Sequence, residues 1–152
     1  MTKTFSLRTL ATALAGLLMA LSAWNASAQT SARDDSLYQQ LGGQPGLVRL
    51  MDDFMQRLLA HPRMNPFFKD VDQAHVKAQL VDQICEVSGG PCRFDGPDMA
   101  KVHSGVDINR GDFNALVEVL QQAMDAQGIA FTAQNRLLAK LAPMHREIIN
   151  VP

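Results

Sequence analysis

The stretch DMAKVHSGVDINRGDF, Asp98 to Phe113, contains a short helical pattern, a polar turn and the start of a long amphipathic helix. MAKVH follows a loop rich in glycine and proline and has room for little more than one or two helical turns, with His103 as its last residue. Asn109 and Asp112 then have the spacing of an N-terminal helix cap. The stretch therefore predicts a short helix that ends in a histidine and a capped helix after it.

Helical periodicity dominates the chain from residue 34 onward, and no alternating pattern predicts a strand. Apolar residues recur at helical spacing in the segments 44–60, 72–87, 113–127 and 133–149. Asp72 and Thr132 are predicted caps, and Pro143 should kink the last helix or end it early. The sequence thus predicts an all-α fold in one domain.

The first 28 residues have the composition of a secretory signal peptide. Lys3 and Arg8 precede the apolar run LATALAGLLMALSAW, and Ala26-Ser27-Ala28 is a small-residue cleavage site. A membrane anchor is the alternative, although the run is shorter than the ~20 residues of a spanning helix. We therefore expect an exported, periplasmic protein that has no membrane contact after cleavage, with residues 29–35 as a short N-terminal segment.

Charge and cysteine content narrow the function classes further. Removing residues 1–28 takes away Lys3 and Arg8 but no acid, so the formal charge changes from −1 to −3 and nucleic acid is not expected as a partner. Cys85 and Cys92 are too few for a structural zinc site. In an oxidising compartment such a close pair is usually bridged, so we predict a disulfide, with two free thiols as the alternative.

An ordered series of motifs resembles the group I truncated haemoglobins. The series is LYQQLGG, DFMQRLLAHPRMNPFF, GGPCRFDG, MAKVH and a long amphipathic helix, with both glycine pairs, Gly42-Gly43 and Gly89-Gly90, at the family's spacings. The resemblance extends from Ser36 to about Ile149 and implies a truncated globin domain over residues 36–152. It also implies a two-over-two helical sandwich that holds a b-type haem.

The resemblance implies that the histidine of the short helix is the axial iron ligand, and His103 occupies that position. Globin haem iron is held by a proximal histidine, which agrees with this role. Taken alone, a single histidine is better explained as an ordinary, partly exposed side chain, and the resemblance reverses that preference. His61 and His145 are predicted to be surface histidines.

The resemblance also implies that apolar residues surround the haem. Each of them taken alone is explained as well by ordinary core packing. Lys69, Lys77 and Lys101 are candidates for contacts with the haem propionates, with solvated lysines as the alternative. The predicted pocket residues are Phe54, Met55, Val76, Leu80 and Ile84 on the distal side, Phe68 near the macrocycle, and Phe94, Met99, Val102, Ile108, Phe113 and Leu116 at the ring edge and proximal side.

The distal side of this chain departs from the family pattern. Many members carry a tyrosine after the helix phenylalanine and glutamines on the next helix, which hydrogen-bond bound oxygen. This chain has Met55, Val76 and Leu80 instead, so we expect an almost entirely apolar distal pocket. One missing hydrogen bond to a polarised acceptor is worth about 1.5–3 kcal/mol, so neither tight oxygen storage nor efficient nitric-oxide dioxygenation is expected.

Three polar residues near Val76 provide alternatives for the distal side. His75 would reach the iron if its helix turned by about 100°, which would give a bis-histidine haem. A solvent-facing His75 is the other reading. Gln79 and Gln83 are weaker distal candidates, because they lie off the apolar stripe that Val76, Leu80 and Ile84 form on the predicted helix.

Three functions follow from these features. The first is a haem protein that reversibly binds O2, CO or NO opposite His103. The second is a redox protein or enzyme, acting in nitric-oxide dioxygenation, peroxidase-like chemistry or electron transfer with a redox partner, and ligation by His75 would matter there. The third is a helical interaction module that has lost haem. Absorption spectra separate the three.

Overall fold

The computed structural model describes residues 34–152, so the predicted signal peptide and residues 29–33 lie outside the described residues. Every regular element in the described part is helical, which confirms the all-α prediction. No helix in this part is long and apolar enough to cross a membrane. The elements in chain order are α1 Ser36–Gln40, α2 Gly43–Ala60, α3 Asn65–Phe68, α4 Gln73–Val87, α5 Met99–His103, α6 Arg110–Ala126, α7 Phe131–Leu141, a 3-10 turn Ala142–Met144, and α8 His145–Ile148.

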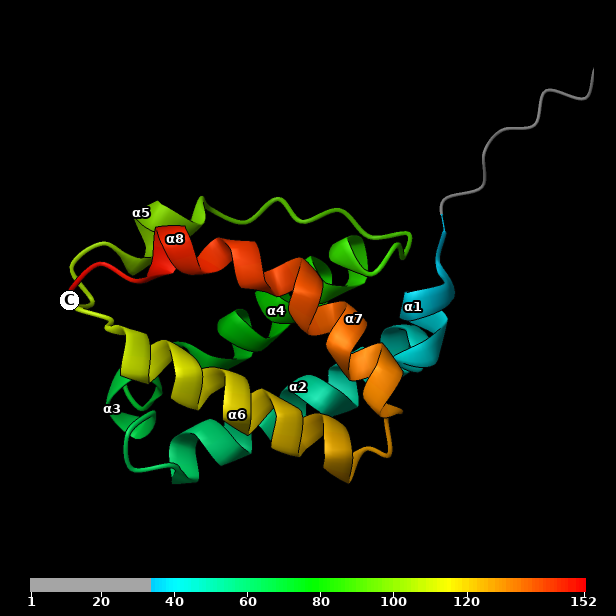
Figure 1. Ribbon diagram of the computed structural model, residues 1–152, viewed down its shortest axis with the longest axis horizontal. Helices are drawn as coiled ribbons and strands as arrows, with labels where there is room; N and C mark the ends of the chain where they lie inside the picture. Colours follow the sequence, from blue (N-terminus) through cyan, green and yellow to red (C-terminus); the bar gives the residue numbers. More distant parts are fainter. Residues whose placement is uncertain (1–33) are drawn as a thin grey trace, which may run out of the picture. The chain divides into compact units, whose positions relative to one another are not determined.

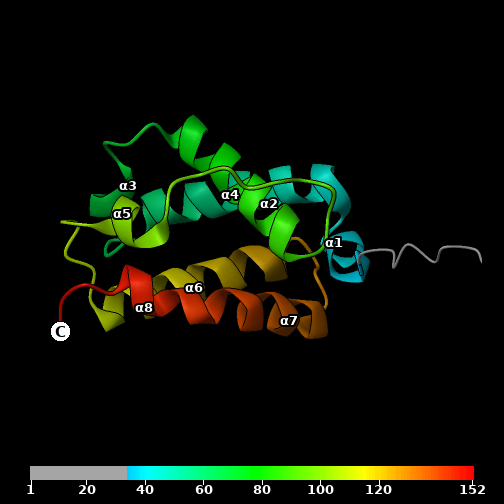
Figure 2. The ribbon, with the colours of Figure 1, turned by 90° about the horizontal axis from the view of Figure 1, so that it is seen from above.

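The long helices form two layers, with α2 and α4 in one and α6 and α7 in the other (Figure 2). Helix α2 packs against both α4 and α6 and so joins the layers. Its Leu47, Leu50 and Leu58 are completely buried, and each such side chain stabilises the fold by roughly 1.5–3 kcal/mol. The short helix α5 lies beside α8, at the opposite end of the domain from α1 (Figure 1).

Most of the predicted helix boundaries are confirmed. The Asp72 side chain accepts a hydrogen bond from the His75 backbone N–H at the start of α4. Asn109 and Asp112 form a reciprocal capping box at the start of α6. Pro143 ends α7 early, because the chain continues from Leu141 as a 3-10 turn.

The predicted cap at Thr132 is wrong, because α7 already begins at Phe131 and its N-cap is Ala130. The buried side chain of Gln134 explains the earlier start. Its Nε2 donates to the Asp125 side chain at 2.7 Å and to the Ile129 carbonyl at 2.9 Å. These bonds fix the turn between α6 and α7 from inside, without a side-chain cap.

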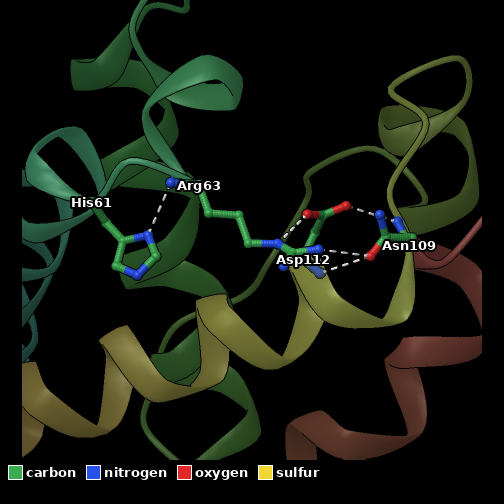
Figure 3. Close-up of polar contacts among 4 residues, drawn as sticks. All are labelled: His61, Arg63, Asn109 and Asp112. Carbon is green, nitrogen blue, oxygen red and sulfur yellow. Dashed lines mark hydrogen bonds and ion pairs between the residues drawn. The ribbon is translucent and has the colours of Figure 1, made fainter.

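An ion pair joins the corner before α3 to the start of α6 (Figure 3). The Arg63 Nε donates to Asp112 Oδ1 at 2.6 Å, and Arg63 Nη2 donates to Asn109 Oδ1 at 3.2 Å. The backbone N–H of Asn109 and the Arg63 guanidinium hold the pKa of Asp112 below its usual range. Because Phe68 follows Arg63 and Phe113 follows Asp112, this ion pair fixes two segments that carry predicted pocket residues.

Candidate functional site

His103 ends α5 with one ring nitrogen already engaged. Asp98 caps the helix by accepting from the Ala100 and Lys101 backbone N–H groups at 2.9 and 3.3 Å. The Nδ1 of His103 lies 2.8 Å from the Met99 carbonyl oxygen. Because a carbonyl only accepts, Nδ1 carries the proton in this contact and Nε2 keeps a free lone pair. His103 therefore offers one neutral imidazole nitrogen, which is the donor that a globin haem requires.

One side of α4 faces the segment that leads into α5. A side chain at Gly96 would overlap the Phe94 ring and Gln79 Oε1, so glycine is required for this close approach. Further along α4, the buried Gln83 places its Nε2 3.7 Å from Met99 Sδ. The structure thus brings the α4 glutamines next to the loop and helix that carry His103.

Most of the predicted pocket residues are half-buried: Phe68, Val76, Leu80, Phe94, Met99, Ile108, Phe113 and Leu116. They come from α3, α4, the loop before α5, α5 itself and the start of α6. Met55 is buried to 3% exposure, yet it is not part of the packed core cluster that includes its neighbour Phe54. The eight half-buried apolar side chains would be stabilised by burial against a further apolar group.

Gln79 adds a polar feature to this region. Its Oε1 is buried and has no hydrogen-bond partner among the described residues. Together with the free Nε2 of His103 and the half-buried apolar side chains, it fits a flat apolar group that has a polar, metal-containing centre. The residues present therefore fit a haem.

The structure shows which residues of α4 pack against the rest of the protein. Val81 and Cys85 are fully or nearly buried, whereas Val76 and Leu80 are only half-buried. The reason is that α4 packs against α2 through the side that carries Val81 and Cys85. Val76 therefore lies on a different side of the helix, whereas Leu80 contacts the core cluster and stays half-buried.

Three other predicted pocket residues lie at the two extremes of exposure. Phe54 and Ile84 belong to the packed core, with 3% and 2% exposure, because they take part in the packing between α2 and α4. Val102 is 46% exposed, because no buried residue lies on the five-residue helix α5. The Val102 side chain is therefore only partly covered by the rest of the described protein.

The remaining predicted polar residues occupy different environments. His75 is exposed in the first turn of α4. Lys77 forms an ion pair with Asp52 at 2.6 Å, so its ammonium group is already engaged on the α2 side. His145, predicted as a surface residue, is half-buried and its ring centroid lies 6.3 Å from that of Phe113.

The structure joins Cys85 and Cys92 by a disulfide. Cys85 is fully buried in the last turns of α4, and Cys92 lies in the loop that leads to Phe94 and α5. The bridge therefore holds one end of this loop against α4.

The chain is similar to known globins over most of its length. The family model of the bacterial-like globins matches residues 36–150. A group 1 truncated hemoglobin from Synechocystis sp. is 30% identical, over 76% of this chain and 98% of that protein. One from Nostoc sp. is 27% identical over the same shares. The truncated hemoglobin of Tetrahymena pyriformis in its Fe(III) form has the same fold, with a TM-score of 0.72 at 24% identity over 75% of this chain and 97% of that one.

Proposed function

Because the chain belongs to the bacterial-like globins and, within them, to the group I truncated haemoglobins, it binds haem, and we propose that His103 is the protein ligand of the haem iron. When bound, the haem would supply an iron centre that can bind O2 or another diatomic gas. We propose a b-type haem and reversible binding of the gas.

One observation supports this assignment above all others. The contact between His103 Nδ1 and the Met99 carbonyl fixes the tautomer that leaves Nε2 available. Such a partner on the second ring nitrogen also orients the imidazole and raises its basicity toward a metal. The half-buried apolar side chains on α4 and α6 would then bury the porphyrin faces.

The distal side is proposed to stabilise bound O2 weakly. No hydrogen-bond donor is present in the side chains of Met55, Val76 and Leu80. Gln79 is the candidate donor, because its amide nitrogen carries two N–H groups and no hydrogen bond to the described residues holds its buried Oε1 in place. The exposed His75 reaches the iron only after a rotation of α4, so bis-histidine ligation remains the alternative.

Ferric and ferrous absorption spectra of the purified holoprotein test this function. We expect a Soret band, a five-coordinate high-spin ferrous form, and a shift of the band when CO is added. A six-coordinate low-spin ferrous spectrum would favour ligation by His75 instead. Absence of a Soret band in protein prepared with haem present would contradict the assignment.

We also propose that the protein is exported to the periplasm, where Cys85 and Cys92 remain bridged. The support is the leader-like composition of residues 1–28 and the buried position of Cys85. Closing so short a loop would stabilise the fold by about 2–3 kcal/mol in the chain-entropy model.

The mass of the protein recovered from the periplasm tests both statements. We expect a chain that begins at Gln29 and gains no mass from an alkylating reagent under denaturing, non-reducing conditions. A mass that still includes residues 1–28 would argue against cleavage. Two added alkyl groups would argue against the bridge.

A further inference from the structure

The C-terminal segment is hydrogen-bonded to both ends of the loop that follows His103. Asn150 Nδ2 donates to the His103 carbonyl oxygen at 2.7 Å, and the Ile108 backbone N–H donates to Asn150 Oδ1 at 2.7 Å. The backbone N–H groups of Asn150 and Val151 also donate to the Ile108 carbonyl, at 3.0 and 3.3 Å. A single side-chain amide thus bridges the residue that ends α5 and the residue just before the cap of α6.

Helix α5 depends on such contacts, because it has little stability of its own. It contains five residues, none of them buried, and a helix this short does not persist in isolation. The loop behind it is exposed, and both Gly105 and Asp107 have positive φ values, of 75° and 59°. Positive φ is uncommon outside glycine, although aspartate adopts it more readily than most residues, so the loop turns sharply at these two positions.

We propose that Asn150 is a positioning residue for His103. Its amide holds the last turn of α5 and the two ends of the loop 104–108 in one arrangement, so that the His103 imidazole keeps one orientation. The proposal rests on the proposed role of His103 as the iron ligand, because orientation of the ring matters for function only then.

The chemistry of the amide allows its two hydrogen bonds to be separated. Asn150→Ala removes both side-chain bonds and keeps the backbone bonds to Ile108. Asn150→Asp keeps an acceptor for the Ile108 N–H, but it cannot donate to the His103 carbonyl when ionised. The matched control is Asn135→Ala, which removes the same atoms from an exposed position on α7.

The experiment uses the holoprotein with three measurements. Resonance Raman spectra of the ferrous form should show a shifted or broadened iron–histidine stretching band in both Asn150 variants. Haem transfer to an excess of apomyoglobin should be three- to tenfold faster, as expected for the loss of about one net hydrogen bond. Hydrogen exchange of the Ile108 amide should be faster in Asn150→Ala alone, with the α2 amides unchanged in every variant.

An unchanged iron–histidine band and unchanged haem loss in both variants would overturn the proposal. So would faster exchange across α2 with an unchanged band, because Asn150 would then only stabilise the fold. If Asn150→Ala fails to fold, the iron–histidine band and the haem loss of Asn150→Asp decide whether the proposal holds, since this variant retains the bond from the Ile108 N–H. Failure of the proposed function gives a different result, namely no iron–histidine band in the wild type or a band that survives replacement of His103.

Discussion

Replacing His103 by alanine should leave a protein that folds but retains almost no haem after purification. The imidazole Nε2 is the proposed protein bond to the iron, and its tautomer is set by the Met99 carbonyl 2.8 Å from Nδ1. Mutating an outer partner of a metal ligand typically costs 10–100-fold in affinity, so removing the ligand itself should cost more than about 100-fold. Haem content by the pyridine haemochromogen assay and the Soret absorbance measure the loss.

His145→Ala is the matched control for this substitution. The Nδ1 of His145 also lies 2.8 Å from a backbone carbonyl oxygen, that of Ala142, and its ring is close to Phe113. It is therefore the histidine whose local geometry most resembles that of His103. We expect the control to keep a normal haem content. Normal haem content and an unchanged ferrous spectrum in His103→Ala would refute the ligand assignment.

Free imidazole provides a second test of the same bond. In His103→Gly the side chain is removed at the last residue of α5, which leaves space for a free imidazole, and added imidazole should restore haem binding and the ferrous spectrum. Loss of haem that imidazole fails to restore would indicate damage to the fold and not loss of a ligand. Circular dichroism of each variant checks that the helices remain.

The second large effect is expected at Met55. Introducing tyrosine there should slow O2 dissociation about tenfold or more and leave CO dissociation nearly unchanged. One recovered hydrogen bond to a polarised acceptor is worth about 1.5–3 kcal/mol, which is one to two decades in rate or affinity. CO is less polar than O2 and gains little from such a donor. Met55 is 3% exposed on α2 and lies outside the packed core cluster, so we expect a side chain at this position to face the bound gas.

Met55→Phe is the control, because it adds the ring and omits the hydroxyl group. Flash photolysis and stopped-flow mixing give the dissociation rates of both gases. The prediction is contradicted if Met55→Tyr behaves like Met55→Phe. Slow O2 dissociation in the wild type would point to a donor already present. Gln79→Leu should then accelerate it, since Gln79 has two amide N–H groups and its buried Oε1 has no partner among the described residues.

Local sequence features were sufficient for the helix that carries His103. Asp98 and Asn109 cap their helices by accepting from backbone N–H groups two or three residues away. A cap of this kind therefore depends only on a few neighbouring residues in the sequence. The same holds for the end of α7 at Pro143, because proline removes a donor from its own helix. The family resemblance, which also rests on ordered local motifs, led to the fold that the structure has.

Only the tertiary structure decided which side of α4 is buried. Helical periodicity fixes the angles between Val76, Leu80 and Ile84, but it says nothing of where α2 lies around that helix. Packing against α2 buries Val81 and Cys85 and leaves Val76 and Leu80 half-buried. The burial of Gln83 has no signal in the sequence for the same reason, since a polar residue is predicted to be exposed unless its partners are known.

The long-range contacts had no local signal at all. Asn150 meets His103 across 47 positions and Arg63 meets Asp112 across 49. Asparagine and arginine are common on surfaces, and neither residue belongs to a motif that points to its partner. The sequence determined which helices form, because helix formation depends on neighbours along the chain, and the family resemblance pointed to His103 as the candidate ligand. The tertiary structure alone determined what holds that histidine in place, because side-chain hydrogen bonds form between groups that only folding brings within about 3 Å.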